Sequence, residues 1–275
     1  MSIVGGRTID RILISTMPRS GTVFFFEMIS RLFDFTKVEP KFTGGFSPKL
    51  PEWDPYKFDE TFDSLSSRQV LCAHYQLNNK IKLLLADKNL LGIYLYRDPR
   101  DVAVSAALYI KYALSHHALH GLFSQLSDSE AITFMLSGGT VQVGSRENKS
   151  NDVDYIYYEG MEYFCRWGDD WLSHPNVAKV RYEDYVTEGS DAIKKALLEV
   201  DVVLDDDVIS AVSTQMSFEK MAAGRSKGTE DKSSHFRKGV IGDHKNHFNG
   251  LHRAISKKQF GDYLIKLGYE QNFTW

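Results

Sequence analysis

The stretch RILISTMPRSGTVFFFEMISRLF (Arg11–Phe33) changes character in its middle. Its apolar run Ile12–Ser15 predicts a short buried strand, and the apolar spacing of Val23–Phe33 predicts a helix. The turn between them contains Gly21, which lets the backbone approach a ligand closely. Several backbone N–H groups and the positive end of the helix dipole meet at this turn, so it suits an anion.

Three more apolar runs predict strands, and helical stretches alternate with them. We expect strands at Val70–Tyr75, Leu90–Tyr96 and Val177–Tyr182, and helices at Asn79–Ala86, Arg100–Leu114, Tyr158–Trp171 and Ala192–Glu199. This alternation is typical of an α/β fold with a mainly parallel sheet flanked by helices, and we expect a single domain over residues 1–275. Ligands of such sheets bind beyond the carboxyl ends of the strands. His74 and Arg97 both lie at such ends.

The composition narrows the class of protein. With Lys+Arg 33 against Asp+Glu 36 the net charge is -3, so no global basic field points to nucleic acid, and any anion site must be local. Only two cysteines, Cys72 and Cys165, indicate a reducing compartment rather than a disulfide framework. The N-terminus lacks a signal-peptide layout, and no apolar run reaches the roughly 18 residues of a membrane span. We therefore expect a cytoplasmic protein without a membrane partner.

Three segments do not follow the alternation of strands and helices. Glu39–Ser67 is rich in proline, glycine and aromatic residues, Gly138–Asp154 is polar and predicts a loop, and Ser226–Asn249 is basic and histidine-rich. Long loops of this kind are usually functional. Near the end of the chain, Ser256 with Gln259 predicts a helix capping box, and Gly268 predicts the end of that helix.

The residue types of the first turn fit an anion, although they do not match the G-x-x-x-x-G-K-S/T pattern of nucleotide triphosphatases. Arg19 can donate two hydrogen bonds to anionic oxygens, and Ser20 and Thr22 add hydroxyl groups beside the backbone amides. Taken alone, the turn is explained equally well by an ordinary strand–turn–helix in which a serine caps the helix.

Two further segments favour the anion site. In YRDPRDVAVS (Tyr96–Ser105), Arg97 leaves a strand end and Ser105 lies two turns into the following helix. In FRKGVIGDHKNHF (Phe236–Phe248), Arg and Lys adjoin a glycine, which suits a loop that closes over a phosphate. The alternatives are surface ion pairs at a helix start and a solvated basic loop.

The three segments, in this order and spacing, resemble the cytosolic-type sulfotransferase family. That family carries a P-K-S-G-T-T-W-like loop, a central R-x-P-x-D-x-x-x-S segment and a C-terminal R-K-G-x-x-G-D-W-K-N-H-F segment, and the resemblance runs from Ile12 to Phe248. It implies a fold related to nucleotide kinases. It also implies transfer of a sulfuryl group from 3'-phosphoadenosine 5'-phosphosulfate (PAPS) to a hydroxyl or amine/guanidinium nitrogen of a small-molecule acceptor. The nucleotide product is PAP, and no metal takes part.

The resemblance assigns roles to individual residues. The 5'-phosphosulfate loop is formed by Arg19, Ser20, Gly21, Thr22 and Val23; the 3'-phosphate is bound by Arg97, Ser105, Arg237, Lys238 and Gly239; and Phe24, Tyr182 and Phe218 lie beside the adenine. Arg19 stabilises the leaving phosphate oxygen. His74 is the base that takes the acceptor proton, although a strand-end histidine bonded to the backbone is the alternative for the same residue. The acceptor is expected to enter by Glu39–Ser67 and Gly138–Tyr158.

The sequence departs from the family pattern at several positions. Arg19 replaces a lysine, Val23 a threonine and His244 a tryptophan, and Cys72 stands where the family has a lysine two residues before the base. Residues Asn249–Ala254 do not preserve the family's dimer motif, K-x-x-x-T-V-x-x-x-E. We therefore make no prediction about whether the protein is a monomer or a dimer.

Two other clusters have alternative interpretations. His116, His117 and His120 are potential metal ligands, but no carboxylate or cysteine with ligand spacing lies nearby, so we expect no metal. The aromatic stretch YIYYE (Tyr155–Glu159) either packs as a helix or lines an acceptor pocket; in the latter case its rings and the nearby acidic residues Asp152, Asp154 and Glu159 favour a cationic acceptor.

Two alternatives to a sulfotransferase stay open at this point. One is a nucleotide-dependent kinase of related fold, which the missing triphosphatase pattern disfavours. The other is a non-catalytic PAP-binding module, suggested by the cysteine at position 72 and disfavoured by the intact His74 and Arg19.

Overall fold

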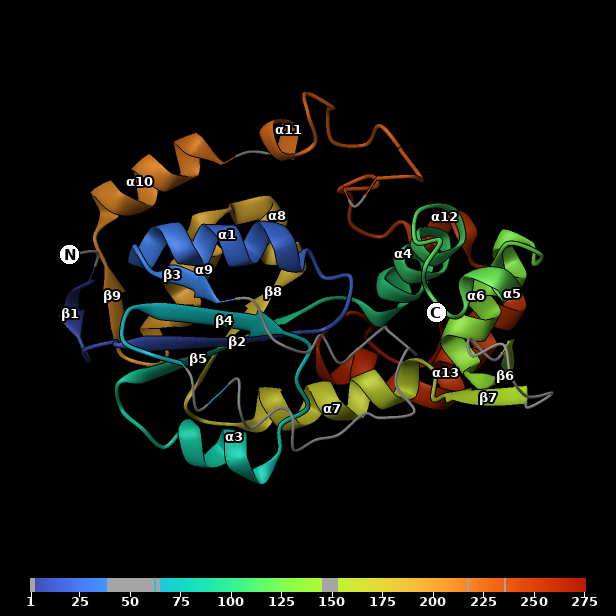
Figure 1. The fold of residues 1–275 in the computed structure, drawn as a ribbon, viewed down its shortest axis with the longest axis horizontal. Helices are drawn as coiled ribbons and strands as arrows, with labels where there is room; N and C mark the ends of the chain where they lie inside the picture. Colours follow the sequence, from blue (N-terminus) through green and yellow to red (C-terminus); the bar gives the residue numbers. More distant parts are fainter. Residues whose placement is uncertain (1–2, 39–61, 63–64, 145–152, 217, 235) are drawn as a thin grey trace. The chain divides into compact units, whose positions relative to one another are not determined.

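The structure is a computed structural model that describes residues 3–38, 62, 65–144, 153–216, 218–234 and 236–275 (Figure 1). The described residues fall into two units. The first unit contains those up to Arg97 together with Trp167–Lys227, and the second contains Asp98–Arg166 and Gly228–Trp275. Most of the predicted acceptor segment Glu39–Ser67 lies outside the described residues.

A five-stranded sheet forms the centre of the first unit. Its strand order is β3 (Thr36–Val38), β4 (Gln69–Ala73), β2 (Arg11–Thr16), β5 (Leu90–Tyr96) and β8 (Val177–Arg181). Each neighbouring pair is parallel. The predicted α/β class with a mainly parallel sheet is therefore confirmed. A separate antiparallel pair joins β1 (Ile3–Gly6) to β9 (Val202–Leu204).

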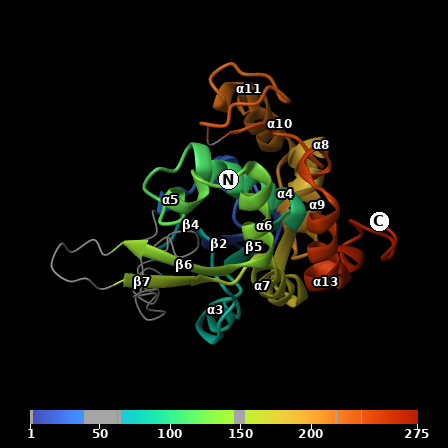
Figure 2. The same ribbon diagram turned by 90° about the vertical axis from the view of Figure 1, so that its right-hand side faces the viewer.

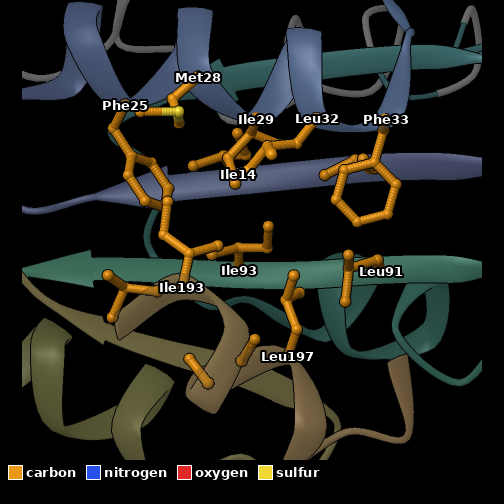
Figure 3. Close-up of a cluster of buried hydrophobic side chains, with 14 of the residues drawn as sticks. Ile14, Phe25, Met28, Ile29, Leu32, Phe33, Leu91, Ile93, Ile193 and Leu197 are labelled. Carbon is orange, nitrogen blue, oxygen red and sulfur yellow. The ribbon is translucent and has the colours of Figure 1, made fainter. Parts of the chain in front are cut away.

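One face of this sheet is covered by α1 (Thr22–Phe33), α8 (Tyr182–Glu188) and α9 (Ser190–Leu198). Figure 3 shows how Phe25 and Ile29 of α1 meet Ile14, Ile93 and Ile193 in one apolar layer. The apolar layer continues to α10 (Asp206–Gln215), and α11 (Phe218–Met221) follows in the chain. The sheet is fully buried on this side, as its unbroken apolar runs predict.

The opposite face of the sheet lies against α3 (Asn79–Leu84) and the last turns of α7 (Met161–Ser173) (Figure 1). The rings of Tyr94 and Trp171 stack with centroids 5.7 Å apart. At Gly92 a Cβ atom would lie 2.4 Å from Leu85 Cδ2, so glycine allows the segment that follows α3 to lie directly on β5.

The second unit is mainly helical. It contains α4 (Pro99–Tyr112), α5 (His120–Phe123), α6 (Asp128–Ser137), α12 (His244–His247) and α13 (Gly250–Lys266). Helix α6 packs on α4 and α13, and α12 packs on α4. An antiparallel hairpin, β6 (Gly139–Gly144) with β7 (Val153–Tyr158), extends from the end of α6 (Figure 2).

Three sequence-based predictions are wrong in this unit. The loop predicted over Gly138–Asp154 contains β6, and the helix predicted from Tyr158 starts only at Met161, because Tyr155–Tyr158 belong to β7. The hairpin pairs Thr140 with Tyr157, and such non-local pairing is not visible in a short window of sequence. The capping box predicted at Ser256 is formed instead by Asn249 and His252, and Ser256 is buried inside α13.

The predicted end of this last helix is confirmed. Gly268 has φ +72°, and its N–H donates to Ile265 O at 3.0 Å. The left-handed glycine therefore follows Leu267, the C-cap residue of α13, as expected for a helix end.

The backbone of Tyr75, the residue after His74, is held by hydrogen bonds to its carbonyl oxygen, and the contribution of these bonds to stability can be tested. This oxygen accepts hydrogen bonds from Trp171 Nε1 at 2.7 Å and from Ser15 Oγ at 2.8 Å. We expect Trp171→Phe to lower the free energy of unfolding by about 1–3 kcal/mol, measured by urea denaturation. Trp171→Phe combined with Ser15→Ala should cost more than the sum of the single changes, because only the double variant removes both donors. Additive costs would contradict this account.

Candidate active site

The turn after β2 has an unusual backbone. Arg19 has φ +62° and Gly21 has φ +87°, so two residues of the turn adopt the left-handed region. Ser20 is fully buried, and its N–H and Oγ both donate to Met17 O. Turns that contain left-handed residues direct successive N–H groups toward one side and bind anions. The backbone of this turn therefore fits the predicted anion site.

The start of α1 contributes further N–H groups. Gly21 is the N-cap residue, and within the described residues no side chain caps this helix. The alternative in which a serine caps α1 is therefore wrong, because the hydroxyl of Ser20 is bonded to Met17 O. The N–H groups of the first helical turn, at the positive end of the dipole, face the turn and fit an anionic group.

Arg97 and Tyr182 lie beside the same turn, although they come from the ends of β5 and β8. Arg97 Nη1 donates to Arg19 O at 3.0 Å, and its guanidinium carbon lies 4.3 Å from the centroid of the Tyr182 ring. A Cβ atom on Gly21 would lie 3.0 Å from the edge of that ring. Both side chains are buried, so the ring and the guanidinium are fixed against the turn.

His74 reaches the turn from the end of β4. Its Nδ1 lies 2.9 Å from Thr16 O and 2.9 Å from Thr16 Oγ1, and Thr16 Oγ1 lies 2.9 Å from Thr22 Oγ1. A carbonyl oxygen only accepts, so the bond to Thr16 O assigns the hydrogen of the neutral ring to Nδ1. The Nε2 atom then carries the lone pair that a base requires.

The surroundings of His74 favour the neutral ring. Burial lowers its pKa from 6.5 to about 4, the hydrogen bond to the Thr16 backbone opposes that shift, and the charge of Arg19 adds to it. The imidazole is therefore uncharged near neutral pH. The alternative interpretation of His74, a strand-end histidine bonded to the backbone, is therefore correct about the bond. The same bond leaves Nε2 able to accept a proton.

In the second unit, Arg237 and Lys238 form a cluster around Asp243. Arg237 Nη2 donates to Asp243 Oδ2 at 2.5 Å, Lys238 Nζ donates to Asp243 Oδ1 at 2.8 Å, and Arg237 Nη1 also pairs with Glu230. Burial alone would raise the pKa of Asp243, but hydrogen bonds from His247, Lys238, Arg237 and Asn246 hold it well below its usual range. The carboxylate is therefore ionised and orients both cationic side chains.

The remaining predicted residues have varied environments. Ser105 is buried on α4, Gly239 has φ +66°, Phe24 packs on Tyr185 with ring centroids 5.8 Å apart, and Val23 is exposed. The side chain of Phe218 lies outside the described residues. Cys72 belongs to the apolar layer between the sheet and α1, so an uncharged side chain suits its position.

The predicted histidine cluster has structural contacts. His117 is buried and its Nδ1 accepts the N–H of Leu119, and His120 Nδ1 bonds to Ile110 O at 2.8 Å. Across the described part of the chain, His, Cys, Asp and Glu form no group arranged for a metal ion. In the same residues, no helix is both long and apolar enough to cross a membrane.

Sequence reasoning missed three residues that position predicted site residues. Thr16 orients His74, Asp101 binds the backbone of His244, and Asp243 binds Lys238 within the same C-terminal segment. For Asp101 and Asp243, the only signal in the sequence is that both lie inside motifs that resemble those of the family. For Thr16 the sequence contains no signal, because a hydroxyl residue at the end of a strand is common.

The carboxyl edge of a parallel sheet thus carries a turn whose backbone fits an anion, with a neutral histidine beside it, an arrangement that in an α/β protein suits transfer of an anionic group. The family model described as sulfotransferase domain matches residues 9–264. The chain therefore belongs to the sulfotransferase domain family, and the predicted family, the PAPS-dependent sulfotransferases, is confirmed.

Individual proteins agree with this assignment. Mouse sulfotransferase 2A6 is 25% identical over 273 residues, which is 93% of this chain and 85% of that protein. A crystal structure of mouse sulfotransferase SULT7A1 complexed with PAP has a TM-score of 0.62 at 22% identity and covers 94% of this chain and 87% of that chain. A crystal structure of retinol dehydratase in complex with androsterone and the inactive cofactor PAP has a TM-score of 0.58 at 17% identity. It covers 92% of this chain and 80% of that chain. At these identities the two structures establish the fold.

The low pKa of His74 predicts a pH dependence of stability. Between pH 6.5 and about 4 the unfolded state binds a proton at this histidine that the folded state does not, so stability falls as the pH falls through this range. We expect His74→Asn to reduce the loss of unfolding free energy between about pH 7 and about pH 4.5 by about 2–3 kcal/mol, measured by urea denaturation. Burial also lowers the pKa of His117 to about 4. Part of the loss of unfolding free energy at low pH should therefore remain in the His74→Asn variant. An unchanged pH dependence in the variant would contradict the assigned neutral state.

Proposed function

We propose that this sulfotransferase transfers a sulfuryl group from PAPS to a hydroxyl or nitrogen of a small-molecule acceptor, with His74 as the base. The observation that carries the proposal is the contact of His74 Nδ1 with Thr16 O, at 2.9 Å, which leaves Nε2 as the proton acceptor beside the anion-binding turn. PAP in the crystal structures of two similar folds supports the choice of donor.

The turn after β2 is proposed to bind the 5'-phosphosulfate. The N–H groups of Arg19, Gly21, Thr22 and Val23 and the positive end of α1 are the donors proposed for its oxygens. Ser20 belongs to the same turn, but its own N–H and hydroxyl donate to Met17 O, so it supports the turn from within. Arg19 is assigned to the phosphate oxygen that becomes the leaving group. A guanidinium stays charged at all working pH values, so this stabilisation does not depend on protonation.

The 3'-phosphate is proposed to be bound by the residues that the family motifs assign to it. These are Arg97, Ser105, Arg237, Lys238 and Gly239. The bonds to Asp243 and Glu230 hold the guanidinium of Arg237 and the ammonium of Lys238 in place, and both groups are cationic donors of the kind that phosphate binds. On the adenine side, the proposal assigns Tyr182, Phe24 and Phe218.

The proposed reaction needs one proton acceptor and no redox step. The acceptor oxygen or nitrogen forms a bond to sulfur, the bond from sulfur to the bridging phosphate oxygen breaks, and its electron pair leaves on PAP. His74 Nε2 takes the acceptor proton. Because charge spreads over the sulfuryl oxygens in flight, positioning and electrostatic stabilisation supply most of the rate enhancement, as in phosphoryl transfer.

We propose that both units belong to one sulfotransferase domain, since the family match spans 9–264. Cys72 and Cys165 are the chain's two cysteines and both are buried, and so low a cysteine content supports a reducing compartment such as the cytoplasm. The two alternatives, a kinase and a non-catalytic PAP-binding module, differ from this proposal in their preferred nucleotide and in turnover.

Removal of the base tests the proposal directly. His74→Asn keeps a donor toward Thr16 O and removes Nε2, so we expect kcat for transfer of radiolabelled sulfate from PAPS to fall by about 100- to 10,000-fold. The affinity for PAP should stay within about threefold, because the donor-binding turn is unchanged. The matched control is His117→Asn, which changes a second histidine whose pKa is lowered and should leave kcat within about threefold.

Three outcomes would contradict the proposal. Equal turnover in wild type and His74→Asn would remove His74 as the base. A wild-type protein that binds PAP and transfers nothing to any acceptor would be the non-catalytic module. A preference for ATP over PAPS would indicate the kinase.

For the acceptor we propose a cationic molecule, an amine or a guanidinium compound. Tyr155 and Tyr157 lie two residues apart in β7, hence on one face, and each is 67% exposed. The exposed Glu159 follows the strand. Aromatic faces and a carboxylate together favour a cation over a neutral ring.

An acceptor survey tests this choice. We expect amines and guanidinium compounds to be sulfated more efficiently than neutral phenols. Tyr157→Leu should raise KM for a cationic acceptor about two- to fivefold and leave KM for PAPS unchanged. Phe273→Leu, at another exposed ring, is the control and should change neither constant. Higher kcat/KM for neutral phenols would count against the proposed acceptor class.

A further inference from the structure

The carboxylate of Asp101 connects two predicted parts of the donor site in the second unit. Asp101 lies in the first turn of α4, and its side chain is completely buried. Its Oδ2 accepts the N–H of Gly242 at 2.7 Å, and its Oδ1 accepts the N–H of His244 at 2.9 Å. One side chain thus fixes the backbone on both sides of Asp243, more than 140 residues further along the chain.

His244 adds a third bond to the same carboxylate. Its Nδ1 lies 2.8 Å from Asp101 Oδ1, and its ring packs on Phe248 with centroids 5.4 Å apart. A carboxylate in a buried ion cluster accepts and does not donate, so Nδ1 carries the hydrogen. Tryptophan stands at this position in the family motif, so this bond is a feature of this chain.

The position of Asp243 determines where the two cationic groups lie. Asp243 is 1% exposed, and it accepts hydrogen bonds from Arg237 and Lys238. Those side chains can adopt many rotamers when unbound, and holding them in one arrangement carries an entropic cost. Because Asp101 and His244 fix the backbone of Asp243, they also fix the arrangement of Arg237 and Lys238.

The same helix face carries Ser105. Asp101 and Ser105 are four residues apart in α4, so they lie one above the other on successive turns. The carboxylate that binds the backbone of Gly242–His244 is therefore the neighbour of the serine that the proposed function assigns to the 3'-phosphate.

We propose that Asp101 and His244 are positioning residues for recognition of the donor's 3'-phosphate. The inference rests on the proposed function, because that function assigns Ser105, Arg237 and Lys238 to this phosphate. In this proposal Asp101 and His244 act through Arg237 and Lys238 and not by contact with the phosphate. They order the cationic groups before the nucleotide binds, so binding does not bear the cost of ordering them.

The experiment compares PAP with AMP, which lacks the 3'-phosphate, by isothermal titration calorimetry. Asp101→Asn places an N–H₂ group against one backbone N–H, and His244→Leu removes the Nδ1 donor. Each should weaken binding of PAP by about tenfold or more and leave binding of AMP within about threefold. His244→Asn restores an N–H donor near the place of Nδ1, so PAP affinity should return to within about threefold of wild type.

A matched control separates positioning from general stability. Ser127 caps α6 in the same unit through a capping box with Glu130. Ser127→Ala should lower the Tm without changing the ratio of PAP affinity to AMP affinity. If Asp101→Asn fails to fold by circular dichroism, the pair His244→Leu and His244→Asn decides the question.

The outcomes distinguish this inference from the proposed function. A wild-type preference for PAP over AMP that survives in both Asp101→Asn and His244→Leu would overturn the inference alone. Equal losses of PAP and AMP affinity in the two variants would also overturn it, since they would indicate a purely structural role. Equal affinity of the wild type for PAP and AMP would contradict the proposed function itself.

Discussion

The register of the parallel sheet is the constraint on which the candidate site of the first unit depends. Ser15 pairs with Ala73 of β4 on one side and with Tyr94 of β5 on the other. The carboxyl ends of β2, β4 and β5 are therefore level, so the turn after β2, His74 and Arg97 emerge at one edge. A shift of one residue would point every side chain of a strand to the opposite face, and the buried layer on α1 prevents it.

At this edge the protein resolves a conflict between burial and charge. A proton acceptor must be neutral before it reacts, yet a buried imidazole also needs a hydrogen-bond partner. The carbonyl of Thr16 satisfies Nδ1 without adding a negative charge, and the neighbouring Arg19 disfavours the protonated ring. A carboxylate in place of this carbonyl would stabilise imidazolium and raise the pKa. Burial therefore keeps the ring uncharged, and the opposing effect of the backbone partner on the pKa is too small to reverse it.

Much of this arrangement was predictable from the sequence because it is local or recurs as a motif. The strand Leu90–Tyr96 was predicted with its observed bounds, and the positions of His74 and Arg97 followed from strand ends. The hairpin of β6 and β7 was missed because its register joins residues on either side of a long connection. Asp101 was visible only as one acid among several, since its partners at Gly242 and His244 are distant in sequence and close only in the fold.

The arginine that stands in place of a lysine at position 19 has a consequence for how the turn after β2 tolerates alkali. The cations at this turn, Arg19 and Arg97, are both guanidinium groups. Neither loses its proton in any medium that the fold withstands, whereas an ammonium group at either place would be partly discharged in strong base. The positive charge that these two side chains place at the turn is thus insensitive to alkalinity.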